Sequence, residues 1–233
     1  PCNDEVASLL SSFNSMIAIQ TKMRDDLIEA EKLKQQLSLN LLQQQVNPHF
    51  LYNTLDNICA LAELDEKETL IQLVMNLSSF YRSSLSNGKM HISIGQELEI
   101  SRAYLEILQI RYFHKFDFTI TCPEALKNYS CIKLLLQPIL ENSIYHGIKG
   151  LDRHGILHIE AEDAGDCIRF TISDNGRGFS KEDYEKIWQQ DADHFGIKSI
   201  QQRILLYYGP GYGLSMESPQ TGGCITVITL PKQ

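Results

Sequence analysis

The chain has 233 residues, of which 43% are hydrophobic and 21% are charged, a composition typical of a globular domain that folds in water. Its formal net charge of −8, with no basic patch interleaved with aromatic residues, speaks against a nucleic-acid-binding protein. The six cysteines form no CxxC pair, and no apolar run reaches the roughly 18 residues that span a bilayer. We therefore expect reduced thiols in a cytosolic compartment and no structural metal site.

Residues 4–47 contain neither proline nor glycine, and they carry apolar side chains at helical spacing. A long helix of this kind cannot bury its apolar stripe alone and needs a partner helix. The spacing falters between Gln20 and Gln36, so one continuous coiled coil is not required. The apolar positions are Val6, Leu10, Phe13, Ile17, Met23, Leu27, Leu37 and Leu41.

The stretch 42–55, Leu-Gln-Gln-Gln-Val-Asn-Pro-His-Phe-Leu-Tyr-Asn-Thr-Leu, is predicted to be the central feature of the N-terminal half. At about 100° per residue, one face of this helix is apolar and the other is polar. The apolar face is predicted to hold Val46, Phe50, Leu51, Leu55, Ile58 and Ala62, and the polar face Gln45, His49, Asn53 and Asp56. Pro48 removes one helical hydrogen bond beside His49. We interpret His49 as an outward-facing, reactive histidine; an ordinary surface histidine is the alternative.

A second helix is predicted over residues 66–86, starting with a capping box at Asp65 and Glu68 and ending at Asn87-Gly88. The short link between 61 and 65 makes helices 22–63 and 66–86 an antiparallel hairpin. Two such hairpins form a four-helix bundle, so this half is predicted to be a homodimer.

From Ser93 onward the pattern changes to mixed helices and strands. Ser93 and Gln96 predict the start of a helix over about 94–112, and an apolar helix is predicted over 131–147. Predicted strands lie at 116–121, 156–162, 167–174, 214–217 and 225–230. Several antiparallel strands with three or four helices indicate an α+β sandwich.

Asp174 begins the segment Asp-Asn-Gly176-Arg-Gly178, directly after a strand. It shares parity with Ile168, Phe170 and Ile172, so its carboxylate points to the inner face of the sheet, where it needs a donor such as an exocyclic amine. The two glycines let the backbone approach such a ligand closely. An ordinary Asp/Gly turn is the alternative.

Asn142 and His146 lie one turn apart on an otherwise apolar helix, within Leu134-Leu-Leu-Gln-Pro-Ile-Leu-Glu-Asn142-Ser-Ile-Tyr-His146-Gly147. A hydrated Mg²⁺ between nucleotide phosphates would satisfy the buried asparagine. Hydrogen bonding to the backbone is the alternative. Further along, His194-Phe-Gly196-Ile-Lys198 opens a helix whose N-terminus and lysine suit phosphate binding.

In this order, the asparagine segment, the Asp-x-Gly-x-Gly segment, the glycine-containing helix start and a C-terminal Gly-Gly resemble the Bergerat-type ATP-binding fold of histidine kinases. Together with Asn-Pro-His-Phe-Leu-Tyr-Asn upstream, they resemble the sensor histidine kinases of the LytS and YesM type over residues 22–233. The opening residues resemble the second helix of a HAMP signalling module, although a plain coiled-coil linker fits them too.

This resemblance implies three regions: the end of a HAMP-like helix at 1–21, a dimerisation and phosphotransfer hairpin at 22–92, and an ATP-binding catalytic domain at 93–233. It implies a protein-histidine kinase that uses ATP and Mg²⁺ and passes the phosphoryl group to an aspartate of a response regulator receiver domain. A membrane-spanning sensor region is expected upstream, with this portion in the cytoplasm.

By the same resemblance, His49 is the phosphoacceptor and Asn53 positions its imidazole or the γ-phosphate. Asn142 binds Mg²⁺, with His146 nearby. The remaining roles concern ATP: Asp174 accepts from adenine, Gly176 and Gly178 allow the approach, and Gly196 with Lys198 contacts the phosphates at the end of the ATP lid.

Several positions depart from the family pattern. Phe50 stands where many histidine kinases have an acidic residue, and Tyr145 where a lysine toward the phosphates is frequent. In the lid, His194 replaces a usual glycine and Ser199 replaces a usual asparagine. One alternative is therefore a degenerate kinase that acts as a signalling scaffold. An ATP hydrolase on the same fold is another. Pro138 speaks against it, because hydrolases of this fold generally have a glutamate there.

Overall fold

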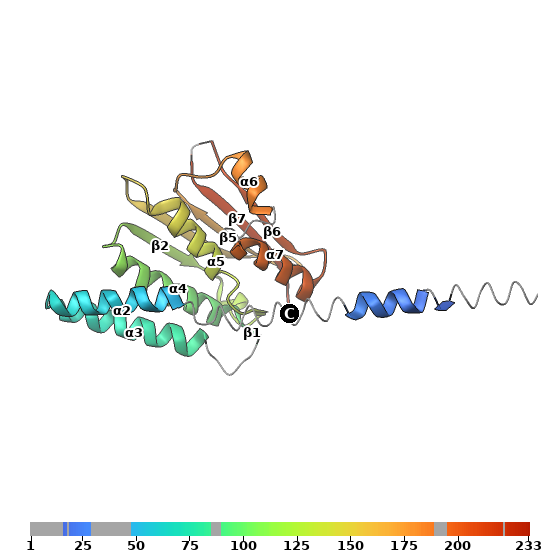
Figure 1. Cartoon of the computed structure of the whole chain (residues 1–233), viewed down its shortest axis with the longest axis horizontal. Coiled ribbons are helices and arrows are strands. Elements are labelled where there is room, and N and C mark those ends of the chain that lie inside the picture. Colours follow the sequence, from blue (N-terminus) through green and yellow to red (C-terminus); the bar gives the residue numbers. More distant parts are fainter. Residues whose placement is uncertain (1–15, 18, 29–47, 85–89, 189–194, 221) are drawn as a thin grey trace, which may run out of the picture. The chain divides into compact units, whose positions relative to one another are not determined.

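The computed structural model describes residues 16–17, 19–28, 48–84, 90–188, 195–220 and 222–233 (Figure 1). The chain divides into two units, Pro1–Val46 and Asn47–Gln233. In the first, the described residues are helical, and the predicted apolar positions Met23 and Leu27 are exposed. Most of the HAMP-like opening, and the part of the predicted 22–63 helix between 29 and 47, lie outside the described residues. No described helix is both long and apolar enough to cross a bilayer.

The second unit begins with the predicted hairpin. Helix α2 (Pro48–Glu63) and helix α3 (Lys67–Ser84) pack against each other. The predicted capping box at Asp65 is wrong. Asp65 has a φ of +57°, a left-handed conformation that ends α2, and α3 begins two residues later at Lys67. An N-cap residue instead needs an extended backbone.

The buried face of α2 differs from the predicted one. Phe50 and Thr54 are buried, and Ile58 is packed against the same core, whereas Leu55 is 44% exposed. The apolar residues of α2 therefore divide between an inner side against α3 and an outer side facing solvent. His49 is exposed, as the helical pattern predicted.

A five-stranded sheet forms the centre of the unit, in the order β2-β4-β5-β7-β6. All the strands expected from the sequence are present. Pairing is antiparallel except between β2 and β4, which run parallel, so the sheet is mixed rather than wholly antiparallel. The strands are β2 (Phe116–Thr121), β4 (Gly155–Ala164), β5 (Cys167–Asp174), β6 (Gly213–Glu217) and β7 (Cys224–Pro231).

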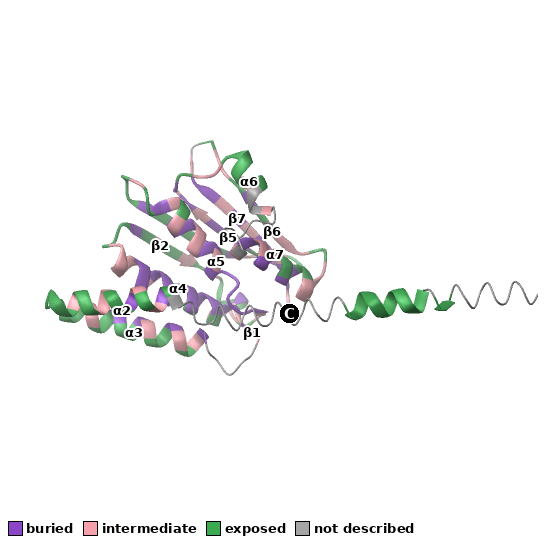
Figure 2. Cartoon of the chain, in the orientation of Figure 1, coloured by how far each residue is buried: buried purple, intermediate pink, exposed green. Residues whose placement is uncertain are grey.

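Helices cover one face of this sheet, which gives a two-layer α+β sandwich (Figures 1 and 2). On β4, Leu157, Ile159 and Ala161 are buried while the residues between them are exposed, the alternation expected of a half-covered sheet. The helical elements are α4 (Ile94–Arg111), α5 (Gln137–Asn142), the π-helical turn η3 (Ser143–Ile148), α6 (Lys181–Trp188) and α7 (Phe195–Tyr208), with a short 3₁₀ turn, η2 (Glu124–Leu126). Two short strands, β1 (His91–Ser93) and β3 (Ser130–Ile132), pair separately.

Helix α4 starts as the sequence predicts. The Ser93 side chain accepts from the Gln96 backbone N–H at 3.2 Å, and the Gln96 side chain accepts from the Ser93 backbone N–H at 3.0 Å. Both bonds are local, because they join residues three apart.

The predicted helix over 131–147 is wrong in its first half, where β3 and a turn precede α5. Pro138 lacks the N–H that a longer helix would donate to the carbonyl of Leu134. That carbonyl accepts from the buried Arg203 of α7 at 3.2 Å. The buried Glu97 of α4 accepts from the N–H groups of Leu134 and Leu136, both at 2.9 Å. Two buried, oppositely charged side chains therefore fix the turn that leads into α5.

Candidate functional site

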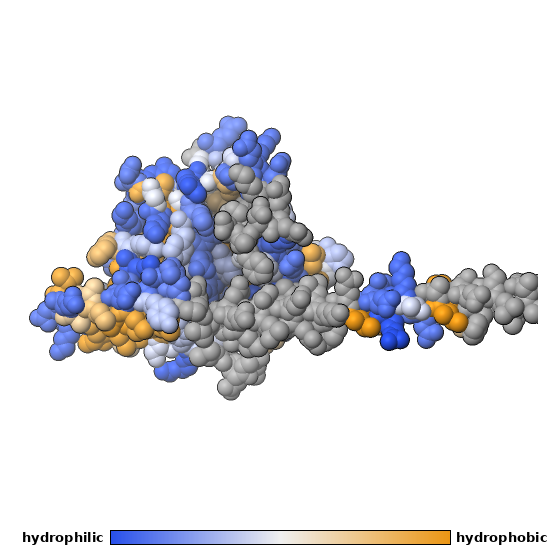
Figure 3. Space-filling view, viewed as in Figure 1, coloured by the Kyte–Doolittle hydropathy of each residue, from blue (hydrophilic) through white to orange (hydrophobic). Residues whose placement is uncertain are grey.

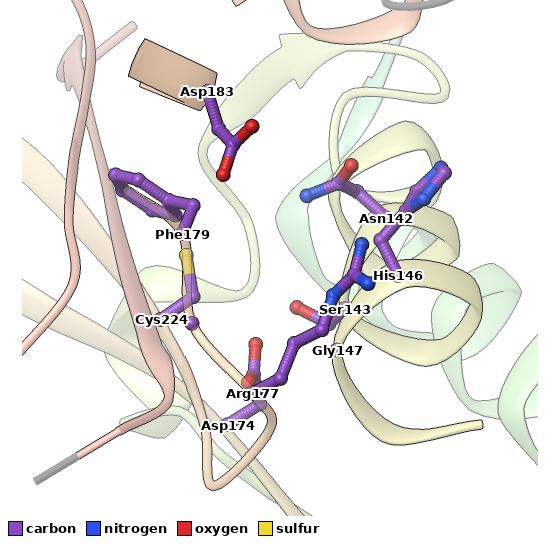
Figure 4. A pocket seen from close by; sticks show the side chains of 10 residues that line it. Asn142, Ser143, His146, Gly147, Asp174, Arg177, Phe179, Asp183 and Cys224 are labelled. Carbon is purple, nitrogen blue, oxygen red and sulfur yellow. The ribbon is translucent and has the colours of Figure 1, made fainter. Parts of the chain in front are cut away.

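A pocket of about 200 Å³ opens between the α5–η3 segment, the loop after β5, α6 and the start of β7 (Figure 4). It brings together residues that are far apart in the sequence. Four of the predicted site residues lie in its wall: Asn142, His146, Asp174 and Gly178. The other lining residues are Ser143, Gly147, Arg177, Phe179, Asp183 and Cys224.

Asp174 ends β5 on the inner face of the sheet, as its parity predicted, and is 9% exposed. Its Oδ1 accepts from the Gly176 backbone N–H at 2.8 Å, whereas its buried Oδ2 has no hydrogen-bond partner among the described residues. Burial raises the pKa of Asp174, while the Ser143 hydroxyl and the N–H groups of Gly176 and Cys224 oppose that shift. The unsatisfied oxygen in the pocket wall can accept a hydrogen bond from a ligand or from water.

The glycines after Asp174 are required by close packing. A Cβ on Gly176 would lie 2.6 Å from the Asp174 carboxylate and 2.7 Å from the backbone of Gly147. Gly178 has a φ of +72°, and a Cβ there would lie 2.3 Å from the Ser218 hydroxyl. Gly178 lines the pocket, and Gly176 instead brings the loop against η3 and sets the position of the carboxylate.

Asn142 ends α5, and His146 lies in the π-helical turn η3 that follows it. Lys149 donates its backbone N–H to the carbonyl of Ile144, five residues back, at 2.8 Å. Asn142 and His146 both lie in the wall, where Figure 4 shows the Asn142 amide pointing into the cavity. Tyr145 points elsewhere, since its hydroxyl accepts from Arg111 at 3.1 Å.

The predicted phosphoacceptor lies on α2, in the same compact unit as the pocket. His49 is exposed, and its neighbour Phe50 is buried between Phe80 of α3 and Tyr104 of α4, with ring centroids 5.3 and 5.1 Å away. Asn53 is half-buried, and its Nδ2 has no hydrogen-bond partner among the described residues. The imidazole therefore faces solvent while the adjacent ring anchors the helix.

Comparison with known families covers both halves of the chain. Residues 37–116 match the family of histidine kinases, and residues 129–233 match the family of histidine kinase-, DNA gyrase B- and HSP90-like ATPases. The chain belongs to the histidine kinase family. The kinase family itself is the one that the sequence motifs predicted.

Among its relatives, this family member is similar to the sensor histidine kinase YesM of Bacillus subtilis, with 31% identity over 98% of the chain. It is also similar to the sensor protein LytS of Staphylococcus haemolyticus, with 27% identity over 94% of the chain. The chain spans 39% of the length of YesM and 37% of LytS. Among solved structures, it is similar to the catalytic domain of histidine kinase ThkA, with a TM-score of 0.49 and 17% identity over 61% of this chain and 94% of that one.

The residues predicted to belong to an ATP lid lie apart from the pocket wall. Gly196 and Lys198 are in the first turn of α7, and neither lines the pocket. A Cβ on Gly196 would lie 3.4 Å from the Cβ of Pro138, so this glycine packs α7 against the start of α5. Ser199 is buried, and His194 lies outside the described residues.

Sequence reasoning missed five side chains of the wall: Ser143, Arg177, Phe179, Asp183 and Cys224. Asp183 could have been found, because its carboxylate accepts from the Ser180 backbone N–H and hydroxyl at 3.1 and 2.8 Å, a capping pattern visible in the sequence. Burial raises the pKa of the Cys224 thiol to about 11, so the thiol is uncharged near neutral pH. No local pattern marked Cys224, which reaches the pocket only through the pairing of β7 with β5.

Proposed function

We propose that this chain is the cytoplasmic phosphotransfer core of a sensor histidine kinase, which moves the γ-phosphoryl group of Mg-ATP to His49. The observation that carries the proposal is the pocket wall with an unsatisfied carboxylate at Asp174 and an amide at Asn142. That wall lies in the same compact unit as an exposed histidine.

The wall fits an adenine nucleotide. Oδ2 of Asp174 would accept a hydrogen bond from the exocyclic amine, and Phe179 and Cys224 supply apolar surface for the base. Asn142 would hold Mg²⁺ through its amide oxygen, with His146 beside it. When bound, the ion neutralises charge on the phosphates. Gly196 and Lys198 would belong to the lid that contacts the phosphates.

His49 would react as the neutral imidazole, whose unprotonated nitrogen carries the lone pair. An N–P bond forms at the γ-phosphorus, the bond from that phosphorus to the bridging oxygen breaks, and ADP leaves. Asn53 would position the ring or the phosphoryl group. Since Phe50 cannot accept a proton, placement and charge neutralisation supply most of the rate.

A second copy of the chain is the partner we propose for the hairpin. Large apolar side chains remain exposed on α2 and α3, and Figure 3 shows hydrophobic surface over this part of the molecule. They are Tyr52, Leu55, Ile71, Val74 and Met75. Burying them between two hairpins gives the four-helix bundle, and sedimentation equilibrium measures the resulting mass.

After autophosphorylation, the phosphoryl group would pass from His49 to a receiver-domain aspartate. The full-length protein would be membrane-anchored through a region N-terminal to residue 1.

Incubation with γ-labelled ATP and Mg²⁺ tests the proposal. The wild type should acquire a label that is lost in acid, because the product is a phosphoramidate. His49→Gln should remain unlabelled while still binding nucleotide, and Asn142→Ala should remain unlabelled because it binds Mg-ATP poorly. His114→Gln, which removes another exposed histidine, should label like the wild type.

Other outcomes identify the competing functions. Steady phosphate release that is unchanged in His49→Gln would indicate an ATP hydrolase. Failure of the wild type to bind Mg-ATP would indicate a signalling scaffold. An acid-stable label would mean that the acceptor is a hydroxyl group.

A further inference from the structure

The formal charges of the described pocket wall are unfavourable for binding a polyphosphate. Two carboxylates, Asp174 and Asp183, line it, and Arg177 supplies the one guanidinium or ammonium group among the lining residues that the structure describes. A nucleotide with several negative charges would therefore meet a wall whose formal charge is negative. A protein cation directed at the phosphates would offset this repulsion.

Arg177 has a fixed backbone and a side chain without a partner. Its N–H donates to the carbonyl of Gly147 at 3.2 Å, and it lies between the two closely packed glycines, Gly176 and Gly178. Its guanidinium makes no hydrogen bond, ion pair or ring contact with the residues that the structure describes. Figure 4 shows the side chain extending from the Asp174 side of the pocket toward Asn142, from the expected base end toward the expected phosphate end.

The neighbouring cations are engaged elsewhere. Arg111 donates to the hydroxyl of Tyr145, and the Lys149 ammonium lies 5.6 Å from the centre of the Tyr145 ring. Arg153 donates to the carbonyl of Asn175 at 2.6 Å. None of these three cations lines the pocket. The position where a lysine toward the phosphates is frequent in the family holds Tyr145, which is turned away.

We propose that Arg177 binds the phosphates of the nucleotide, in the place of the cation that Tyr145 does not provide. Its planar fork of N–H donors can pair with two phosphate oxygens at once. This inference rests on the proposed function, because it takes the ligand to be a nucleoside polyphosphate with its base at Asp174.

The experiment compares the affinities of ATP and adenosine for three proteins: the wild type, Arg177→Gln and Lys181→Gln. Lys181 is exposed at the start of α6 and outside the pocket wall, so its variant matches the loss of one surface charge. Arg177→Gln should weaken ATP binding by about 10- to 100-fold, the effect of losing charge-assisted hydrogen bonds. Adenosine affinity should change less than about twofold, since the nucleoside has no phosphate for a charged partner. Arg177→Lys should recover part of the ATP affinity.

Two results would overturn the inference. An equal loss for ATP and adenosine would show that Arg177 contacts the base or ribose. Unchanged ATP affinity in Arg177→Gln, or the same loss in Lys181→Gln, would show that the guanidinium makes no specific contact. A wild type that binds neither ligand would refute the proposed function as well, which separates the two failures. Thermal unfolding of each variant checks that the fold is retained.

Discussion

Replacing Phe50 by alanine tests how α2, the helix that carries the proposed phosphoacceptor His49, is held. Phe50 is 2% exposed, and its ring lies 5.3 Å from Phe80 and 5.1 Å from Tyr104. These three rings belong to α2, α3 and α4, so the substitution removes the shared contact of three helices.

The expected loss follows from the burial of the ring. Truncating a buried phenylalanine to alanine costs about 3–5 kcal/mol, through lost transfer free energy and the cavity left behind. A domain has a free energy of unfolding of about 5–15 kcal/mol, so the variant should fold but with a large part of its stability removed.

Urea unfolding followed by circular dichroism measures this difference. Phe113→Ala is the matched control, because Phe113 is the same residue type and 88% exposed. Surface substitutions change stability by about 0.5 kcal/mol or less, so the control should unfold at the wild-type urea concentration. The burial of Phe50 predicts that the free energy of unfolding of Phe50→Ala is lower than that of Phe113→Ala by about 2–4 kcal/mol. A difference of about 1 kcal/mol or less between the two variants would refute the anchoring role of Phe50.

Three further predictions concern the pocket. Burial raises the pKa of Asp174 above 3.8, so ATP affinity should fall as the pH decreases through that raised value, because a protonated carboxyl no longer accepts freely. The same shift also affects stability, because the folded state favours the protonated carboxyl of Asp174. The free energy of unfolding of the wild type, relative to that of Asp174→Asn, should therefore decrease as the pH rises from 3.8 through the raised pKa. Urea unfolding at several pH values measures this difference. Gly176→Ala should weaken ATP binding, since its Cβ would lie 2.7 Å from the backbone of Gly147; Gly211→Ala, with no atom within 4 Å, should bind ATP normally in the same titration. Equal binding by the two glycine variants would contradict the packing argument.

Local patterns predicted much of the fold because their causes lie within a few residues. The Ser93 capping box joins residues three apart, and the alternation along β5 follows from the pleat of a strand. The turn before α5 could not be predicted in this way. It depends on Glu97 and Arg203, which lie 37 and 69 residues from Leu134 along the chain. Parallel pairing of β2 with β4 likewise depends on contacts that no local pattern records.

The candidate site likewise has features that local patterns predicted and features that they did not. Parity in the strand predicted that Asp174 points inward, and the structure agrees. A period of 3.6 residues placed Asn142 and His146 on one helix face but could not predict a π-helical turn, in which the bond from Lys149 to Ile144 spans five residues. Asn142 and His146 nevertheless both line the pocket, and π-helical turns are frequently found at functional sites.

The adjacent residues His49 and Phe50 show how one helix can present one ring to solvent and bury the next. Successive helical residues differ by about 100° in direction, so one ring can be buried while the next faces solvent. An acidic residue in place of Phe50 would put a carboxylate among Phe80 and Tyr104, at a desolvation cost that an apolar ring avoids. Phe50, which follows the proposed phosphoacceptor, therefore serves packing. The chemistry proposed for His49 must then come from the neutral imidazole and from the groups that hold the nucleotide.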